Sequence, residues 1–131
     1  MDAVLIYDAD CIPCSTAARV AGRGDVGVLA WQETEAQRFL EAQYGEPRLA
    51  LYLVALDVES VYVGRAAAEE TARRMGSSRF TRSTLSRLYP GLVDVLDRLQ
   101  GRRTWSRSGV DAVEPGAEAY LDDLARAAEP A

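Results

Sequence analysis

Short apolar runs separated by turn residues organise the first half of the chain. Four of these runs have the length and the β-branched content of buried strands. They span Val4–Ile6, Val26–Trp31, Leu49–Leu56 and Val61–Val63. Leu49–Leu56 is almost unbroken in its apolar character, as expected for a central strand that is covered on both faces.

Segments with apolar residues at helical spacing alternate with these runs. The helices predicted in this half of the chain span 15–21, Glu35–Tyr44 and Ala66–Met75. Thr34 is a candidate cap for the second helix, and Gly45 is its candidate end.

From Thr81 onward the pattern predicts helices only. Leucines and valines at helical spacing mark one amphipathic helix over about 92–99, with Pro90 near its start. An Arg-rich loop over Gly101–Gly109 precedes a last, acidic helix over about Ala117–Ala127.

Both cysteines of the chain directly follow the first predicted strand, in the segment Asp8-Ala9-Asp10-Cys11-Ile12-Pro13-Cys14. A helix-prone segment comes next, so we expect Cys11 near a helix N-terminus, where unpaired N–H groups and the helix dipole favour a thiolate. Cys14 lies one turn further along the same face, within reach of a disulfide, and Pro13 stiffens the loop between the sulfurs. The pair predicts a reversible dithiol, with metal ligation and an unreactive pair of small apolar residues as alternatives.

The element order β-α-β-α-β-β-α followed by helices predicts the fold class. Two early βα units give parallel strands and the later hairpin adds antiparallel ones, so we expect a mixed sheet of about four strands flanked by helices. With Cys-x-x-Cys at the end of the first strand, this is the outline of a thioredoxin-like α/β fold. We expect this domain to cover 1–109, with a helical extension from about 81, followed by a C-terminal acidic helix or tail over 110–131.

Two carboxylates precede the first cysteine. Asp8 ends the first strand and could exchange a proton with Cys14 during thiol-disulfide exchange, or it could serve only as a turn residue or a helix cap. Asp10 places a negative charge beside Cys11, which opposes thiolate formation. We interpret Asp10 as a cap or turn residue that restrains the reactivity of Cys11.

Candidate substrate contacts lie beside the second and third strands. In thioredoxin-like folds a cis-proline before the third strand faces the cysteines, and the residue before it offers backbone hydrogen bonds to the substrate. Glu46-Pro47 has this order, although Gly45-Glu46-Pro47 is also an ordinary end of a helix, so a cis and a trans bond are both open. Trp31 could line a groove beside the dithiol, or it could pack in the core.

Composition narrows the possible chemistry. The 131 residues include 15 basic and 20 acidic side chains, for a net charge of −5, and no His. Without His, a Ser-His-Asp triad, a Cys-His pair and a His-ligated metal are excluded within the chain. An Arg-rich stretch over 79–107 could bind nucleic acid, but its interleaved acidic residues and the acidic chain favour a solvated face. We expect neither nucleic acid nor membrane as a partner, and a cytoplasmic location.

The segment Tyr7–Cys14 resembles the opening motif of the DCC family of predicted thiol-disulfide oxidoreductases. The family is named for a D-x-x-C-x-x-C pattern, and Asp8, Cys11 and Cys14 fill its three positions. Ala9 stands where the family usually has Gly. The resemblance implies a class of activity and names no substrate.

The resemblance extends over about residues 3–107. Val61–Ala67 is similar to that family's strand-Gly-x-x-Ala start of a helix, and the Leu88–Leu92 turn with Arg102-Arg103 resembles its helical C-terminal part. The order Cys-x-Pro-Cys departs from the family, which usually has Pro directly after the first cysteine, and is closer to thioredoxin itself.

These features together predict a small thiol-disulfide oxidoreductase in which Cys11 attacks a disulfide and Cys14 resolves the mixed disulfide. No nucleotide-binding glycine pattern is present, so we expect no cofactor. Electrons must then come from a protein dithiol, an external reductase or a small thiol. A metal-binding module that uses the two thiolates is one alternative, and a non-enzymatic interaction domain that docks through its C-terminal helices is another.

Overall fold

A computed structural model describes residues 1–10, 26–75, 105 and 107–128. The helices predicted over 15–21 and 92–99 lie outside these residues. The described elements, in chain order, are β1 (Ala3–Tyr7), β2 (Val26–Ala30), α2 (Thr34–Tyr44), β3 (Tyr52–Ala55), β4 (Ser60–Val63), α3 (Arg65–Met75), β5 (Gly109–Ala112), α5 (Pro115–Glu118) and α6 (Leu121–Ala127).

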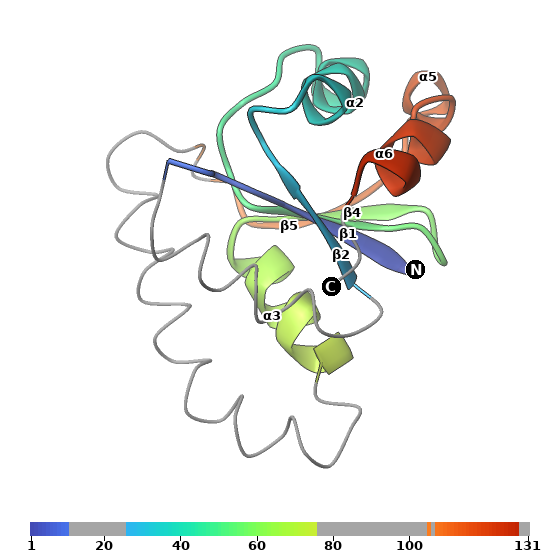
Figure 1. The fold of residues 1–131 in the computed structure, drawn as a ribbon. Helices are drawn as coiled ribbons and strands as arrows, with labels where there is room; N and C mark the ends of the chain where they lie inside the picture. Colours follow the sequence, from blue (N-terminus) through green and yellow to red (C-terminus); the bar gives the residue numbers. More distant parts are fainter. Residues whose placement is uncertain (11–25, 76–104, 106, 129–131) are drawn as a thin grey trace.

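The five described strands form one mixed sheet in the order β2-β1-β3-β4-β5 (Figure 1). β1 pairs in parallel with β2, and each of the other neighbouring pairs is antiparallel. The expected mixed sheet is therefore confirmed, with one strand more than predicted, and the arrangement is that of a thioredoxin-like α/β fold. The hairpin of β3 and β4 follows from the turn residues between two apolar runs.

Helices cover both faces of the sheet, α2, α5 and α6 on one face and α3 on the other (Figure 1). Successive residues of a strand point to opposite faces, so Val4 and Ile6 of β1 lie in the core beneath α2, and Ala3 and Leu5 lie in the core on the α3 side. Burial on both sides explains why the first four residues of β1, Ala3–Ile6, are all apolar.

The boundaries of α2 confirm one predicted signal and correct another. Gly45 ends the helix with φ 83°, and its N–H donates to the carbonyl of Glu41 over 2.8 Å. A left-handed residue of this kind favours glycine, because it has no Cβ. Thr34 is not the cap: it is the first residue of the helix, and Glu33 precedes it in an extended conformation without a side-chain cap bond.

The third strand is shorter than its apolar run. β3 covers only Tyr52–Ala55 of the predicted Leu49–Leu56. Two carbonyl groups just before β3 accept backbone hydrogen bonds. The carbonyl of Leu49 accepts from the N–H of Trp105 over 2.7 Å, and the carbonyl of Leu51 accepts from the N–H of Gly64 over 2.8 Å. The bond from Gly64 continues the β3–β4 register by one residue. Ala50 lies in the core on the α2 side and Leu51 packs against the core on the α3 side, which accounts for the apolar character of these two residues.

The C-terminal part corrects the prediction of helices only. β5 pairs antiparallel with β4, with Gly109 opposite Val63, at one edge of the sheet. The single acidic helix expected over Ala117–Ala127 is divided into α5 and α6.

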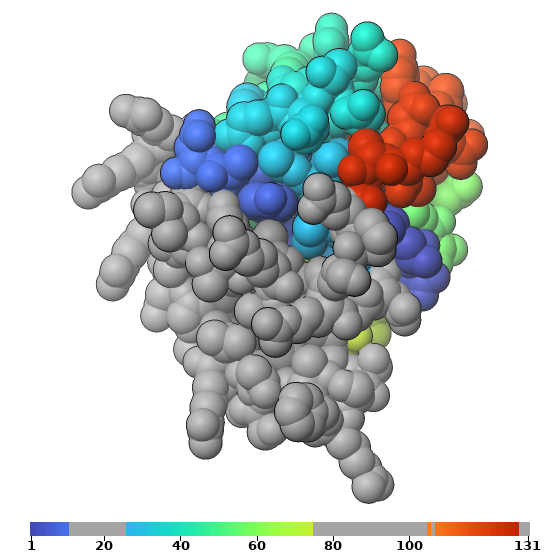
Figure 2. Space-filling model, in the orientation of Figure 1, coloured from blue at the N-terminus to red at the C-terminus, as the bar shows by residue number. Residues whose placement is uncertain are grey.

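Whether the segment after Gly109 packs on the domain was left open by the sequence, and the structure answers it. Ala117 and Leu124 are fully buried in the core that includes Phe39 of α2. Figure 2 shows α5 and α6, in orange and red, lying against α2, in cyan. The described C-terminal residues thus belong to the same folded unit as the sheet.

Candidate functional site

The carboxyl ends of β1 and β2 meet at one edge of the sheet, because parallel strands run in the same direction. Tyr7 and Ala30 are the last paired residues. The N–H of Trp31 then donates to the carbonyl of Tyr7 over 2.6 Å, which extends the contact one residue past the strands. Asp8–Asp10 and Gln32 therefore leave the sheet side by side.

Asp8 forms the turn that leads toward the cysteines. Its Oδ1 accepts the N–H of Asp10, two residues on, over 3.0 Å. This is the contact by which aspartate stabilises a turn on its own backbone. The turn role considered for Asp8 is therefore present, and Asp10 takes part in it through its backbone.

Gln32 joins this turn to the end of β2. Its Nε2 donates to Oδ1 of Asp8 over 2.7 Å, and its Oε1 accepts the N–H of Ala9 over 3.1 Å. A longer contact of 3.4 Å runs from Nε2 to Oδ2 of Asp10. Sequence reasoning missed Gln32, and only its position two residues after the strand that pairs in parallel with β1 could have indicated it.

Cys11, Pro13 and Cys14 lie outside the described residues. The proposed nucleophile, resolving thiol and loop proline are therefore known here by sequence position alone. Asp10, the last described residue of this segment, is exposed and directly precedes Cys11.

Trp31 packs against the core on the α2 side and is partly buried there. Its indole N–H donates to the carbonyl of Arg48 over 3.1 Å, and its own carbonyl accepts the side-chain amide of Gln37 over 2.6 Å. Of the two roles considered for Trp31, these contacts support core packing.

Glu46-Pro47 does not take the cis form that one interpretation required. The structure has no cis peptide bond among the described residues, which include both of these. Pro47 also precedes the first residue of β3, Tyr52, by five positions. The exposed side chain of Glu46 pairs with Arg48 over 3.2 Å. The hypothesis of a cis-proline that faces the dithiol is therefore wrong.

An aromatic cluster that the sequence did not predict lies at the same end of the sheet as Asp8. Trp105 meets Tyr44 edge-on with ring centroids 5.1 Å apart, and the guanidinium groups of Arg48 and Arg107 lie 5.3 and 5.9 Å from its ring centroid. These distances permit cation–π attraction. Arg107, the one described arginine of the basic 79–107 stretch, also pairs with Asp111 of β5.

Two phenols in this cluster are held in their neutral form. Burial, reinforced by the hydrogen bond that Tyr44 donates to Asp111 over 2.8 Å, raises the pKa of Tyr44 far above its usual value. Burial likewise raises the pKa of Tyr52, whose hydroxyl donates to the carbonyl of Arg48 over 2.5 Å. Both tyrosines therefore act as hydrogen-bond donors: Tyr44 ties α2 to β5, and Tyr52 ties the loop before β3 to the sheet.

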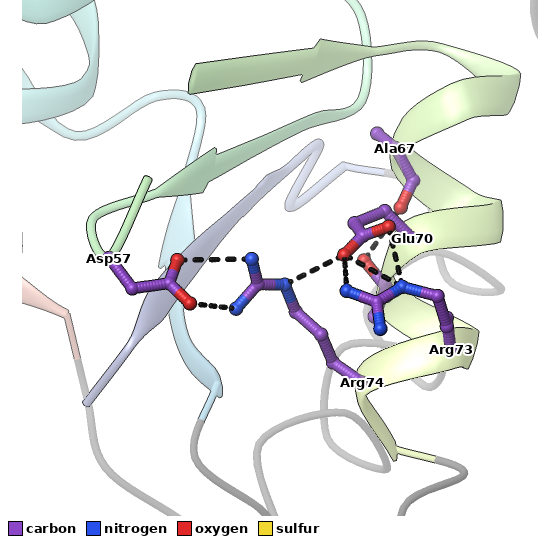
Figure 3. A network of polar contacts seen from close by, with 6 residues as sticks. Asp57, Ala67, Glu70, Arg73 and Arg74 are labelled. Atoms are coloured by element: carbon purple, nitrogen blue, oxygen red, sulfur yellow. Dashed lines mark hydrogen bonds and ion pairs between the residues drawn. The ribbon is translucent and has the colours of Figure 1, made fainter. Parts of the chain in front are cut away.

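A second polar network lies at the opposite end of the sheet (Figure 3). Arg74 of α3 donates to Asp57 over 3.0 and 3.2 Å and to Glu70 over 3.1 Å, and Glu70 also accepts from Arg73. The hydrogen bond from Arg74 lowers the pKa of Asp57, and the hydrogen bond from Arg73 lowers the pKa of Glu70. This network ties α3 to the turn between β3 and β4.

This network lies away from the candidate site. Ala55, two residues before Asp57, pairs with Ala3 at the start of β1, whereas Asp8 follows the end of β1. We therefore assign the network a structural role.

The described residues offer no other sign of a ligand site. Among them no group of three or more His, Cys, Asp or Glu side chains is placed to hold a metal ion. In the part of the chain that the structure describes, none of the helices has the length and apolar character needed to span a bilayer. Comparisons with models of protein families, with curated proteins and with solved structures found no match.

Proposed function

We propose that this chain is a thiol-disulfide oxidoreductase that works in a reducing compartment such as the cytoplasm. The observation that carries the proposal is the position of β1, which lies between parallel β2 and antiparallel β3 and ends four residues before Cys11. A Cys-x-x-Cys after such a strand is the thioredoxin-like arrangement. The D-x-x-C-x-x-C resemblance to the DCC family supports the same class of activity.

The reaction exchanges two electrons and two protons between the cysteine pair and a partner disulfide. The Cys11 thiolate attacks one sulfur of the partner, forms a mixed disulfide and releases the first partner thiolate. Cys14 then loses its proton and attacks Cys11, which forms the Cys11–Cys14 disulfide and releases the second partner thiolate. The partner is reduced to a dithiol, and an external reductase or a small thiol returns the pair to its reduced state.

Asp8 is the proposed proton acceptor for Cys14. It leaves β1 at the edge from which the cysteine segment continues, and it is half-buried. A positioned carboxylate can accept a proton in the transition state of such a step. The bonds from Gln32 and Asp10 hold this carboxylate in one orientation.

A redox titration of the Cys11–Cys14 pair tests the proposal. The protein is equilibrated in thiol-disulfide buffers, free thiols are alkylated, and the intact mass reports the fraction oxidised. We expect a two-electron transition between roughly −120 and −270 mV, the span from strong oxidants to thioredoxin-like reductants. Cys11→Ser and Cys14→Ser are the matched controls, and each should abolish the transition.

A pair that stays reduced throughout the titration would contradict the proposal. Thiols that react only after a chelator is added would indicate the metal-binding alternative. The metal content of protein purified without chelator separates that outcome from an unreactive pair.

A further inference from the structure

We propose that a second copy of this chain binds along strand β5, so that the two β5 strands pair antiparallel and Val110 lies opposite Val110 of the second copy. β5 is an edge strand: β4 lies on one side of it, and the described residues include no strand on the other. The cysteine pair takes no part in this interface, so the proposal is independent of the proposed function.

The register of the sheet shows which backbone groups of β5 are open. In an antiparallel ladder, alternate residues bond to the neighbouring strand, and the residues between them point their N–H and C=O groups away from it. The N–H of Val113 donates to the carbonyl of Glu59 over 3.0 Å. The residues that bond toward β4 are therefore Val113, Asp111 and Gly109. The N–H and C=O of Val110 point outward, and neither has a hydrogen-bond partner in the described part of the chain.

Gln43 of α2 covers the C-terminal end of this edge. Its Nε2 donates to the carbonyl of Ala112 over 2.9 Å, and its Oε1 accepts the N–H of Glu114 over 2.8 Å. The side-chain amide thus uses its donor and its acceptor on the edge, as the peptide group of a neighbouring strand would. The open part of the edge therefore ends near Ala112 and includes both backbone groups of Val110.

An exposed apolar side chain marks the same position. Val110 is 53% exposed, although valine is the residue of β5 with the highest strand propensity. It pairs with Tyr62 of β4, so it lies on the α3 side of the sheet. Ala112, two residues on, shares this face and is also exposed. Pairing centred on Val110 brings the two valines into contact, removes apolar surface from water and lets each valine exchange two hydrogen bonds with the other.

Charge complementarity favours a second copy over an unrelated extended peptide. In this register Gly109 lies directly opposite Asp111 of the second copy, in a non-hydrogen-bonded pair, where side chains come closest. Nη2 of Arg107 lies 3.8 Å from the position that a Cβ of Gly109 would take. The Arg107 guanidinium therefore faces Asp111 of the second copy, and two-fold symmetry forms this contact twice. Arg107 and Asp111 already pair within one chain, so the interface joins four alternating charges.

Sedimentation-velocity ultracentrifugation of the full chain tests the proposal, in a reducing buffer that prevents disulfides between chains. We expect wild type to change from monomer to dimer between about 1 µM and 1 mM, the range in which small interfaces associate. Val110→Pro removes the outward N–H and leaves the bonds between β5 and β4 in place. It should raise the dissociation constant of the dimer by about tenfold or more, because both bonds donated by residue 110 are lost.

Matched variants separate pairing through β5 from association of another kind. Val110→Glu places two like charges at the centre of the interface and should also weaken the dimer. Val58→Glu makes the same substitution in the turn between β3 and β4, where the valine is 57% exposed, and should leave the dimer unchanged. Arg107→Gln should raise the dissociation constant by roughly two- to tenfold, the scale of two exposed ion pairs. Circular dichroism checks that each variant is folded.

The results that would overturn the proposal are specific. One is a wild type that stays monomeric throughout this concentration range, and another is a dimer that persists in both Val110 variants. Equal loss of the dimer in Val58→Glu would indicate general association of exposed apolar side chains and would overturn it as well. If Val110→Pro does not fold, Val110→Glu decides the question. The redox titration of the dithiol and this experiment can succeed or fail separately.

Discussion

Gln43 connects the first half of the fold to its C-terminal part, and its replacement tests whether that part contributes to stability. The side chain is 7% exposed. Its Nε2 donates to the carbonyl of Ala112 at the end of β5 over 2.9 Å, and its Oε1 accepts the N–H of Glu114 over 2.8 Å. Gln43→Leu keeps much of the side-chain volume and removes both hydrogen bonds.

The expected loss follows from these two bonds. Each intramolecular hydrogen bond contributes about 1 kcal/mol net, so the free energy of unfolding should fall by about 2 kcal/mol. A larger loss is not expected, because Ala112 and Glu114 are exposed and water can reach the two backbone groups. For a domain of this size that loss corresponds to a fall in Tm of roughly 6–10 °C.

Urea and thermal unfolding followed by circular dichroism measure this change. Glu41→Leu, which introduces the same residue at an exposed position of α2, controls for helix propensity and for an added apolar side chain. If Gln43→Leu were as stable as Glu41→Leu, the bridge to β5 and α5 would not contribute to stability. The C-terminal segment would then be attached by its apolar contacts alone.

Two further predictions concern the core and the network at the far end of the sheet. Leu124→Ala should lower the free energy of unfolding by about 2–5 kcal/mol in urea denaturation, because Leu124 is fully buried, whereas Leu121→Ala, at a partly buried position of the same helix, should cost less. A loss under about 0.5 kcal/mol for Leu124→Ala would show that α6 is not docked in solution. Because the pKa values of Asp57 and Glu70 are lowered in the folded state, their contribution is present above the unfolded values of 3.8 and 4.5 and is lost as pH falls through the folded ones. Wild type should therefore lose stability between about pH 5 and pH 3 more steeply than an Asp57→Asn, Glu70→Gln variant, and equal slopes in urea titrations at several pH values would contradict this assignment.

The strands and their pairing could largely be predicted because the signal for them is local. The apolar run at Val4–Ile6 became β1, extended by one residue at each end. Turn residues between the runs 49–56 and 61–63 predicted the hairpin of β3 and β4. Both inferences rest on patterns among neighbouring residues, which favour a strand or a turn locally.

β5 could not be predicted in the same way. Gly109-Val110-Asp111-Ala112 contains glycine and aspartate, which are depleted in strands, and its one large apolar residue, Val110, is 53% exposed. The segment is a strand because it pairs with β4 and is held on both sides, by the Trp105 bond to Leu49 before it and by Gln43 after it. These partners lie 45 or more positions away in the sequence, so no local pattern carries the information.

Only part of the candidate site could be predicted from the sequence, for a related reason. The cysteines and Asp8 lie in one segment, so their spacing could be read directly. Gln32 lies 24 positions from Asp8 and meets it only because β1 and β2 end together. A glutamine after a strand has no distinctive pattern of its own.

The two roles considered for Asp8 are compatible, because they use different oxygens. The turn engages Oδ1 through Asp10 and Gln32, and the proposed proton transfer needs only Oδ2. Asp8→Asn can keep the turn, since its amide oxygen still accepts both bonds, but its amide nitrogen cannot take a proton. Gln32→Glu does the reverse: it keeps the Asp8 carboxylate and removes the hydrogen bond from Gln32 to Oδ1. The two substitutions therefore separate the geometry of the turn from the chemistry of the carboxylate, and Asp8→Asn should slow resolution by Cys14, the step in which the proton is proposed to move.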